Sequence, residues 1–190
     1  MTRLANIEKA GYFPLPPSVT DLIVSHVTAP HGGRLLDPCA GEGTALVTLA
    51  QGWGLEPFGV ELHADRAETA RQRVAEFRMQ HAAWEKNSPA ELRTPQALLH
   101  DSYLNLKSAR GGYNLLYLNP PYLRDDGGQD AAETNGSTEY QFLWRTRPYL
   151  QADGLLVYVV PQHPAQPQTG AVPECALSGC PGVSLPGWGV

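Results

Sequence analysis

Short apolar segments alternate with amphipathic segments along residues 17–162, and this alternation constrains the fold more than any other feature of the sequence. The apolar segments are typical of strands buried on both faces, because their apolar residues follow one another with little interruption. Five strands are expected, over residues 34–36, 56–62, 97–103, 113–122 and 154–162. Four helices are expected, over residues 17–28, 44–53, 63–85 and 137–150. This order predicts an α/β fold with a doubly wound parallel sheet and right-handed crossovers.

Length and periodicity indicate one domain with a tail. The chain has 190 residues, enough for one domain with a hydrophobic core and too few for two domains of ordinary size. After Gln162 the chain is rich in Pro, Gly, Ser and Ala and shows neither a helical nor a strand period. We therefore expect a domain over residues 1–163 and an irregular tail over residues 164–190.

Several classes of protein are disfavoured by composition. No run of 18 apolar residues and no N-terminal apolar region is present, so neither a membrane span nor a signal peptide is expected, and the protein is placed in the cytoplasm. The three cysteines, Cys39, Cys175 and Cys180, show no CxxC spacing, which disfavours a zinc site or a disulfide framework. No metal site is predicted.

The basic residues of the longest expected helix are interleaved with glutamates. They are Arg66, Arg71, Arg73 and Arg78, with Glu68 and Glu76 between them. The chain as a whole carries a net charge of −5. This pattern indicates a solvent-exposed helix face rather than a row of phosphate contacts.

Polar side chains stand at the ends of the first four expected strands: Asp37, Glu61, Asp101 and Asn119. In an open parallel sheet, ligands bind beyond the carboxyl ends of the strands. Each carboxylate could instead cap the helix that follows it. Three carboxylates at successive strand ends favour a binding site at this edge over three separate caps.

The loop "DPCAGEGT" after the first strand places Gly41 and Gly43 where the backbone can approach a ligand closely. Leu46 stands where a dinucleotide-binding loop has its third glycine, and Asp37 would repel a pyrophosphate. A carboxylate here suits a ligand with positive charge, such as an ammonium or sulfonium group. Glu61, eighteen positions after Gly43, could accept both hydroxyls of a ribose, and Asp101 could accept from an adenine amino group.

The segment Asn119-Pro120-Pro121-Tyr122 ends the fourth strand with two hydrogen-bond acceptors and an aromatic ring. The acceptors are the side-chain oxygen of Asn119 and the carbonyl of Pro120. An aromatic amine is a weak nucleophile, and two acceptors aimed at its hydrogens stabilise the charge that develops when it reacts. The prolines stiffen the loop, and Tyr122 offers a face on which an unstacked base can lie.

These segments together resemble those of class I S-adenosylmethionine-dependent methyltransferases over about residues 8–163. "LLDPCAGEGTAL" is similar to the cofactor loop, "GVELHADRA" to the ribose motif, "LLHDSY" to the adenine motif and "LLYLNPPY" to the catalytic motif. The catalytic motif resembles that of enzymes acting on the N6 amino group of adenine, and "GYFPLPPSVTDLIVSHV" is similar to the segment before the cofactor loop in the γ-type order. The chain also resembles DUF6094-type proteins of bacteria and mobile elements.

The resemblance implies a Rossmann-like fold, S-adenosylmethionine as cofactor and DNA as substrate, and it allows for a separate recognition subunit as a partner. It implies cofactor contacts from Tyr12, Phe13, Pro14, Asp37, Pro38, Ala40, Gly41, Gly43, Glu61, Leu62, Asp101 and Ser102. It implies catalytic roles for Asn119, Pro120, Pro121 and Tyr122. Tyr103 would flank the adenine ring together with Ser102.

Two alternatives remain open. The same motif occurs in enzymes that methylate protein glutamine or RNA bases, because those amino groups pose the same chemical problem. The resemblance also implies seven strands, of which we expect the last two to be missing, so an inactive, truncated methyltransferase domain is the second alternative.

Overall fold

A computed structural model of the chain describes residues 13–29, 32–81, 97–121 and 138–160. Its centre is a sheet of five strands: β1 (Arg34–Asp37), β2 (Glu56–Glu61), β3 (Leu98–His100), β4 (Tyr113–Leu118) and β5 (Leu150–Tyr158). The strands lie in the order β3-β2-β1-β4-β5, and every neighbouring pair is parallel. The predicted parallel α/β sheet is therefore confirmed.

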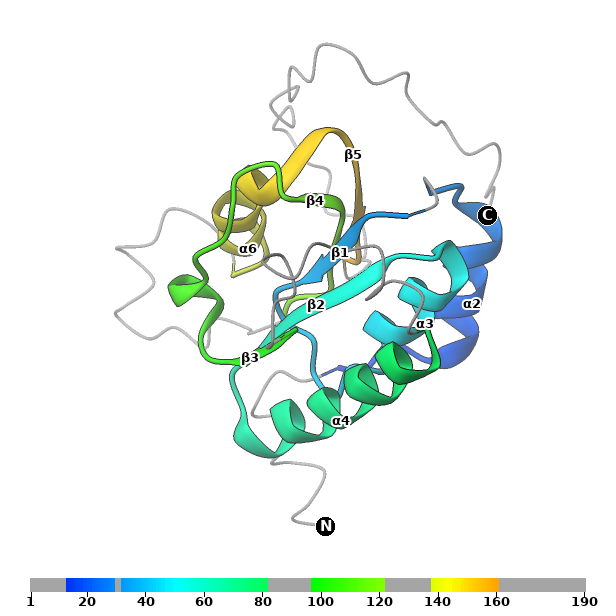
Figure 1. Cartoon of the computed structure of the whole chain (residues 1–190). Helices are drawn as coiled ribbons and strands as arrows, with labels where there is room; N and C mark the ends of the chain where they lie inside the picture. The colour runs from blue at the N-terminus through cyan, green and yellow to red at the C-terminus, as the bar shows by residue number, and fades with distance from the viewer. Residues whose placement is uncertain (1–12, 30–31, 82–96, 122–137, 161–190) are drawn as a thin grey trace, which may run out of the picture. The chain divides into compact units, whose positions relative to one another are not determined.

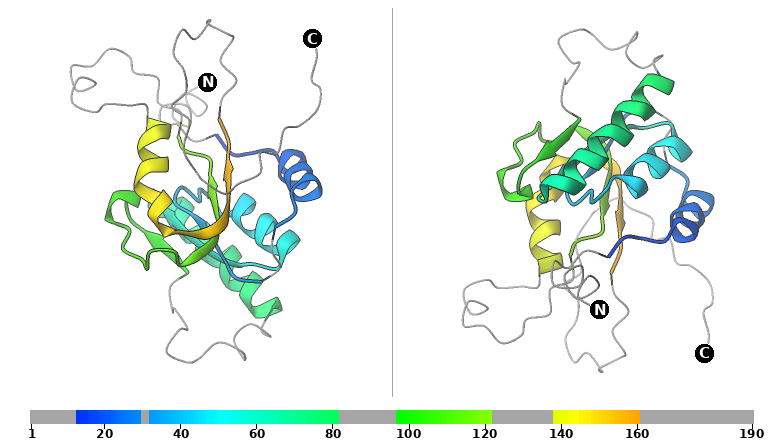
Figure 2. Two further views of the ribbon diagram at one scale, coloured as in Figure 1. Left: turned by 90° about the horizontal axis from the view of Figure 1, so that it is seen from above. Right: turned by 90° about the horizontal axis from the view of Figure 1, so that it is seen from below.

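Helices cover the sheet on both faces. Helices α2 (Pro17–His26), α3 (Thr44–Trp53) and α4 (Ala64–Gln80) lie on one side, and α6 (Thr138–Thr146) lies on the other (Figures 1 and 2). Two short 3-10 helices, η2 (Tyr103–Asn105) and η4 (Arg147–Tyr149), precede β4 and β5. α3 and α4 lie in the crossovers from β1 to β2 and from β2 to β3, which run toward one edge of the sheet, whereas α6 lies in the crossover from β4 to β5, which runs toward the other edge. Right-handed crossovers that run in opposite directions place their helices on opposite faces of the sheet.

The core forms between the sheet and the helices α3 and α4. β1 and β4 are central and their leucines are almost fully buried, which accounts for their continuous apolar sequences. On α4 the buried residues Ala67, Ala70, Val74 and Phe77 recur at helical spacing. Ala64, at the first position of this helix, is exposed.

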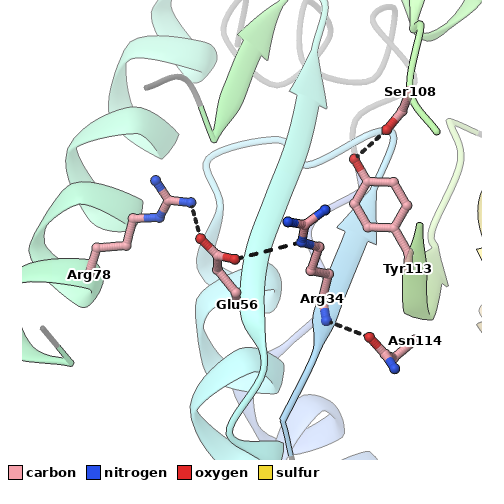
Figure 3. A network of polar contacts seen from close by, with 6 residues as sticks. All are labelled: Arg34, Glu56, Arg78, Ser108, Tyr113 and Asn114. Carbon is pink, nitrogen blue, oxygen red and sulfur yellow. Dashed lines mark hydrogen bonds and ion pairs between the residues drawn. The ribbon is translucent and has the colours of Figure 1, made fainter. Parts of the chain in front are cut away.

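A polar network holds the amino ends of the central strands (Figure 3). The side-chain oxygen of Asn114, on β4, accepts from the backbone N–H of Arg34 on β1 at 2.8 Å. Glu56, at the start of β2, pairs with Arg34 and with Arg78 of α4. Ionic and polar contacts therefore occupy the edge of the sheet opposite the four predicted polar strand ends.

The fourth helix and the fifth strand do not have their predicted bounds. The helix was expected to reach residue 150, but α6 ends at Thr146 and the η4 turn follows, because Pro148 cannot donate to a continuing helix. Strand β5 begins at Leu150, before the predicted start at residue 154. Its pairing with β4 shifts register after Tyr113, and Asp153 takes a positive φ of 62°. The irregular first part of the strand, residues 150–153, contains no continuous apolar run, so apolar runs in the sequence do not predict it.

The prediction that the arginines of α4 lie on a solvent-exposed face is wrong for two of the four. The side chains of Arg66 and Arg78 are only 20% and 18% exposed, and they pair with Glu61 and Glu56 of β2. Arg71 does fit the prediction, since it pairs with Glu68 of the same helix. Within the described ranges, no helix combines the length and the apolar character that crossing a membrane requires. The predicted tail lies outside the described residues.

Candidate functional site

A cavity of about 270 Å³ opens at the carboxyl ends of the strands. It is lined by residues from the loops after β1, β2, β3 and β4 and by the segment that precedes α2. Twelve of the predicted site residues line it: Phe13, Pro14, Asp37, Pro38, Ala40, Glu61, Leu62, Asp101, Ser102, Tyr103, Asn119 and Pro121. The parallel sheet therefore brings together side chains that lie more than 100 positions apart in the sequence.

Asp37 is the most deeply buried acid of the cavity, with 2% of its surface exposed. Its side-chain oxygen accepts from the backbone N–H of Cys39 at 3.0 Å. Burial raises the pKa of Asp37 to about 7, although the hydrogen bonds from Cys39 act in the opposite direction. A positive group placed beside this carboxylate would favour its ionised form, so the site suits an ammonium or sulfonium.

Glu61 is the second buried acid, and it faces the glycine loop. Its Oε2 accepts from the backbone N–H of Gly41 at 2.9 Å. Its Oε1 accepts from the backbone N–H of His63 at 2.9 Å and from Nε and Nη2 of Arg66 at 3.0 and 2.9 Å. These donors fix the carboxylate at the end of β2, between the loop and the start of α4.

The two glycines of the loop act through the backbone, and neither lines the cavity. Gly41 donates to Glu61, and the loop is tied to β2 by the bond from Ala40 N–H to the Val60 carbonyl. Gly43 has a φ of 79°, and a Cβ added there would lie 3.0 Å from the Cβ of Ala70 on α4. Gly43 therefore permits a tight turn and close packing of α3 against α4.

The loop after β3 supplies the polar residues Asp101 and Ser102. Oδ1 of Asp101 accepts from the side chain of Asn105 at 2.8 Å and from the backbone N–H of Ser102 at 2.6 Å. These bonds lower the pKa of Asp101 below its usual value, so it is ionised at neutral pH. The Ser102 hydroxyl accepts from Leu104 N–H and so caps η2. Capping thus accounts for part of what these side chains do.

Asn119 follows β4 directly, and its side chain has a set orientation. Its Nδ2 donates to the backbone carbonyl of Phe13 at 3.1 Å. This bond assigns Oδ1 to the opposite side of the amide group, as the acceptor. Pro121 lines the cavity beside Asn119, whereas Pro120 is buried and does not. Tyr12 and Tyr122, both predicted site residues, lie outside the described residues.

Further residues line the cavity that the sequence did not assign to it, among them Arg66, Tyr117 and Phe142. Phe142 of α6 stacks on Tyr103 with ring centroids 3.6 Å apart and planes 19° from parallel, which forms an aromatic wall. Cys39 is half-buried at the cavity. Burial and the nearby Asp37 carboxylate raise its pKa well above the usual value, so it stays a protonated thiol.

Comparison with known proteins identifies the fold, and one family model matches slightly less than half of the chain. Residues 1–91 match the uncharacterised methyltransferase family DUF6094. No curated protein matches the chain. The type I restriction-modification system methyltransferase subunit from Streptococcus thermophilus is similar at 20% identity and a TM-score of 0.54, over 78% of this chain and 34% of that one.

Two further solved structures agree. They are SAM-dependent methyltransferases from Thiobacillus denitrificans and Geobacter sulfurreducens, each in complex with S-adenosyl-L-homocysteine, at 16% and 15% identity and TM-scores of 0.52. Each match covers 83% of this chain and 55% of the other, so the chain spans about half of their length. At these identities the likeness establishes the fold, which is the Rossmann-like fold of methyltransferases, as predicted.

Proposed function

We propose that the protein is an S-adenosylmethionine-dependent methyltransferase that acts on a planar exocyclic amino group, most simply N6 of adenine in DNA. The family match over residues 1–91 and the fold support methyl transfer. The observation that carries the proposal is that Asn119 lines the same cavity as Asp37, Glu61 and Asp101. An acceptor for an amino group and three carboxylates for a cationic nucleoside thus share one cavity.

The chain's residues fit the two ends of this cofactor. The buried carboxylate of Asp37 suits the positively charged methionine end, and Glu61 and Asp101 suit the ribose and adenine. S-adenosylmethionine supplies, when bound, a methyl group on a sulfonium centre. Within the described part of the chain, no group of His, Cys, Asp or Glu residues could hold a metal ion.

Asn119 and Pro120 would act on the substrate amino group. The Phe13 carbonyl accepts from Nδ2 of Asn119 and so orients Oδ1 as the acceptor for one amino hydrogen. In this proposal the Pro120 carbonyl would accept the other, although Pro120 is buried and only its neighbours Asn119 and Pro121 line the cavity. The Asn119 amide is oriented before the substrate arrives, so this acceptor needs little reorganisation when positive charge develops on the nitrogen. Removing one such group typically lowers the rate by about 10²- to 10³-fold.

The test is methyl transfer from tritium-labelled S-adenosylmethionine to separate pools of DNA, RNA and protein. We expect label in DNA, and after digestion in N6-methyladenine. Label confined to protein glutamine or to RNA bases would exclude DNA and leave the amino-group chemistry. Failure of the protein to bind S-adenosylhomocysteine in calorimetric titration would refute the proposal and favour an inactive domain.

Asn119→Ala separates catalysis from cofactor binding. Because Asn119 contacts the substrate in this proposal, the variant should keep its affinity for S-adenosylhomocysteine within about threefold while its rate falls by about 10²-fold or more. An unchanged rate would show that the amide is not the acceptor.

A further inference from the structure

Glu61 has almost all of its hydrogen-bonding capacity in use. A carboxylate offers about four acceptor positions, two on each oxygen. Oε1 accepts from the N–H of His63 and from the side-on guanidinium of Arg66. Among the described residues, Oε2 accepts from Gly41 N–H. One position therefore remains on Oε2, and both positions on Oε1 are taken.

This arrangement bears on how the carboxylate can hold a ribose. Two neighbouring hydroxyls that bind a carboxylate in a bidentate manner require one acceptor position on each oxygen. The position on Oε2 is available to the first hydroxyl. On Oε1 the second hydroxyl would have to replace one of the two donors already bound there. The backbone N–H of His63 is fixed at the start of α4, so the donor that can be replaced is the guanidinium of Arg66.

Arg66 is placed so that it can move. It stands in the first turn of α4, lines the cavity, and keeps 20% of its side chain exposed, whereas Glu61 is only 5% exposed. A long side chain that is partly exposed can turn toward solvent without disturbing the helix backbone. Glu61 would then retain its two backbone N–H donors and accept a hydroxyl in place of the guanidinium.

We propose that Arg66 is an exchangeable partner of Glu61, and that it competes with one ribose hydroxyl of the cofactor for Oε1. Arg66 thereby sets how strongly the protein distinguishes a ribose from a deoxyribose in its cofactor. This proposal rests on the proposed function, because it takes S-adenosylmethionine and S-adenosylhomocysteine as the ligands of the cavity.

The experiment is a calorimetric titration with S-adenosylhomocysteine and its 2′-deoxy and 3′-deoxy analogues. Four proteins are compared: the wild type, Arg66→Met, Arg66→Lys and Arg71→Met. Arg71→Met is the matched control, because Arg71 lies on the same helix and pairs with Glu68 on the exposed surface. Arg66→Lys keeps a cation beside Glu61 and tests whether charge at this position is sufficient.

In the wild type, one of the two deoxy analogues should bind within about threefold of S-adenosylhomocysteine. The hydroxyl that this analogue lacks would gain a hydrogen bond to Glu61 only at the cost of the ion pair between Glu61 and Arg66, so losing it changes the affinity little. In Arg66→Met the same analogue should bind about tenfold or more weakly than S-adenosylhomocysteine, as expected for one hydrogen bond to a charged group. Arg71→Met should match the wild type, and Arg66→Lys should lie closer to the wild type than to Arg66→Met.

Equal discrimination in the wild type and in Arg66→Met would overturn the role of Arg66 while leaving the proposed function intact. Absence of S-adenosylhomocysteine binding to all four proteins would overturn both. If Arg66→Met does not fold, the wild type still decides the matter through nuclear magnetic resonance of its nitrogen-labelled arginines. The Nε–H signal of Arg66 should shift when S-adenosylhomocysteine binds and stay in place with the weakly discriminated analogue; an unchanged signal in both cases would refute the exchange.

Discussion

The burial of Asp37 should make the ligand-free protein less stable as the pH rises. Its pKa is raised from 3.8 to about 7 in the folded protein, chiefly by burial. A carboxyl group with a raised folded pKa favours folding while it is protonated. That contribution is complete below pH 3.8 and is lost as the pH rises toward 7. The full loss is about 4 kcal/mol, from about three pKa units at about 1.4 kcal/mol each.

Asp37→Asn isolates this effect. The amide cannot ionise, and its side-chain oxygen can still accept from the backbone N–H of Cys39. Its NH₂ group adds donors that cost about 1 to 3 kcal/mol if they are buried without partners, and this cost does not depend on pH. A comparison of the two proteins at two pH values therefore cancels the amide's own cost.

The assay is urea unfolding of the wild type and Asp37→Asn at pH 5 and pH 8 without ligand. From pH 5 to pH 8, the stability of Asp37→Asn relative to the wild type should increase by about 2 to 3 kcal/mol, since a single group with these two pKa values loses most of its contribution over that range. A relative stability that is the same at both pH values would show that Asp37 titrates normally in the folded protein, and would refute the reasoning from burial.

Three further outcomes are expected. The affinity for S-adenosylhomocysteine should rise about 25-fold from pH 5.5 to 7.5 if only the ionised form of Asp37 binds the ligand's ammonium group. In calorimetry, the affinity of Asp37→Asn should not change with pH over this range. A parallel rise in the variant would assign the titration to another group. Gly43→Ala should lower the free energy of unfolding more than Gly32→Ala does, by about 1 kcal/mol or more, because both glycines have a positive φ but only at Gly43 would the new Cβ meet Ala70. Equal losses would mean that the backbone conformation alone matters. Glu56→Gln should cost about 1 kcal/mol of stability by weakening the pairs with Arg34 and Arg78. Its affinity for S-adenosylhomocysteine should stay within about twofold of the wild type, because Glu56 stands at the start of β2 and does not line the cavity. A larger loss of affinity would show that the two ends of the sheet are coupled.

The sheet and the polar strand ends could be predicted from sequence because both are local signals. Asp37 and Glu61 each end a run of apolar residues, and parallel strands bring their carboxyl ends together whatever the helices do. Asp101 and Asn119 followed from the same rule, although each stands one residue beyond its strand.

The contacts of Arg66 could not be predicted in this way. Charge patterns on a helix compare a residue with its neighbours three and four positions away on that helix. Arg66 instead reaches back to Glu61, which becomes accessible only because α4 starts immediately beyond the end of β2. The stacking of Tyr103 on Phe142 was hidden for a similar reason, because it depends on where α6 packs against the loop after β3.

The bond between Asn119 and Phe13 joins positions 106 residues apart. A contact with so large a sequence separation carries a high entropic cost of loop closure, so it is expected to form late in folding, after the sheet has brought β4 beside β1. The orientation of the Asn119 amide is thus among the last features of the native state to be established. A protein whose sheet is complete, but whose segment before α2 has not docked, would retain the carboxylates of the cavity and lack an oriented acceptor for the amino group.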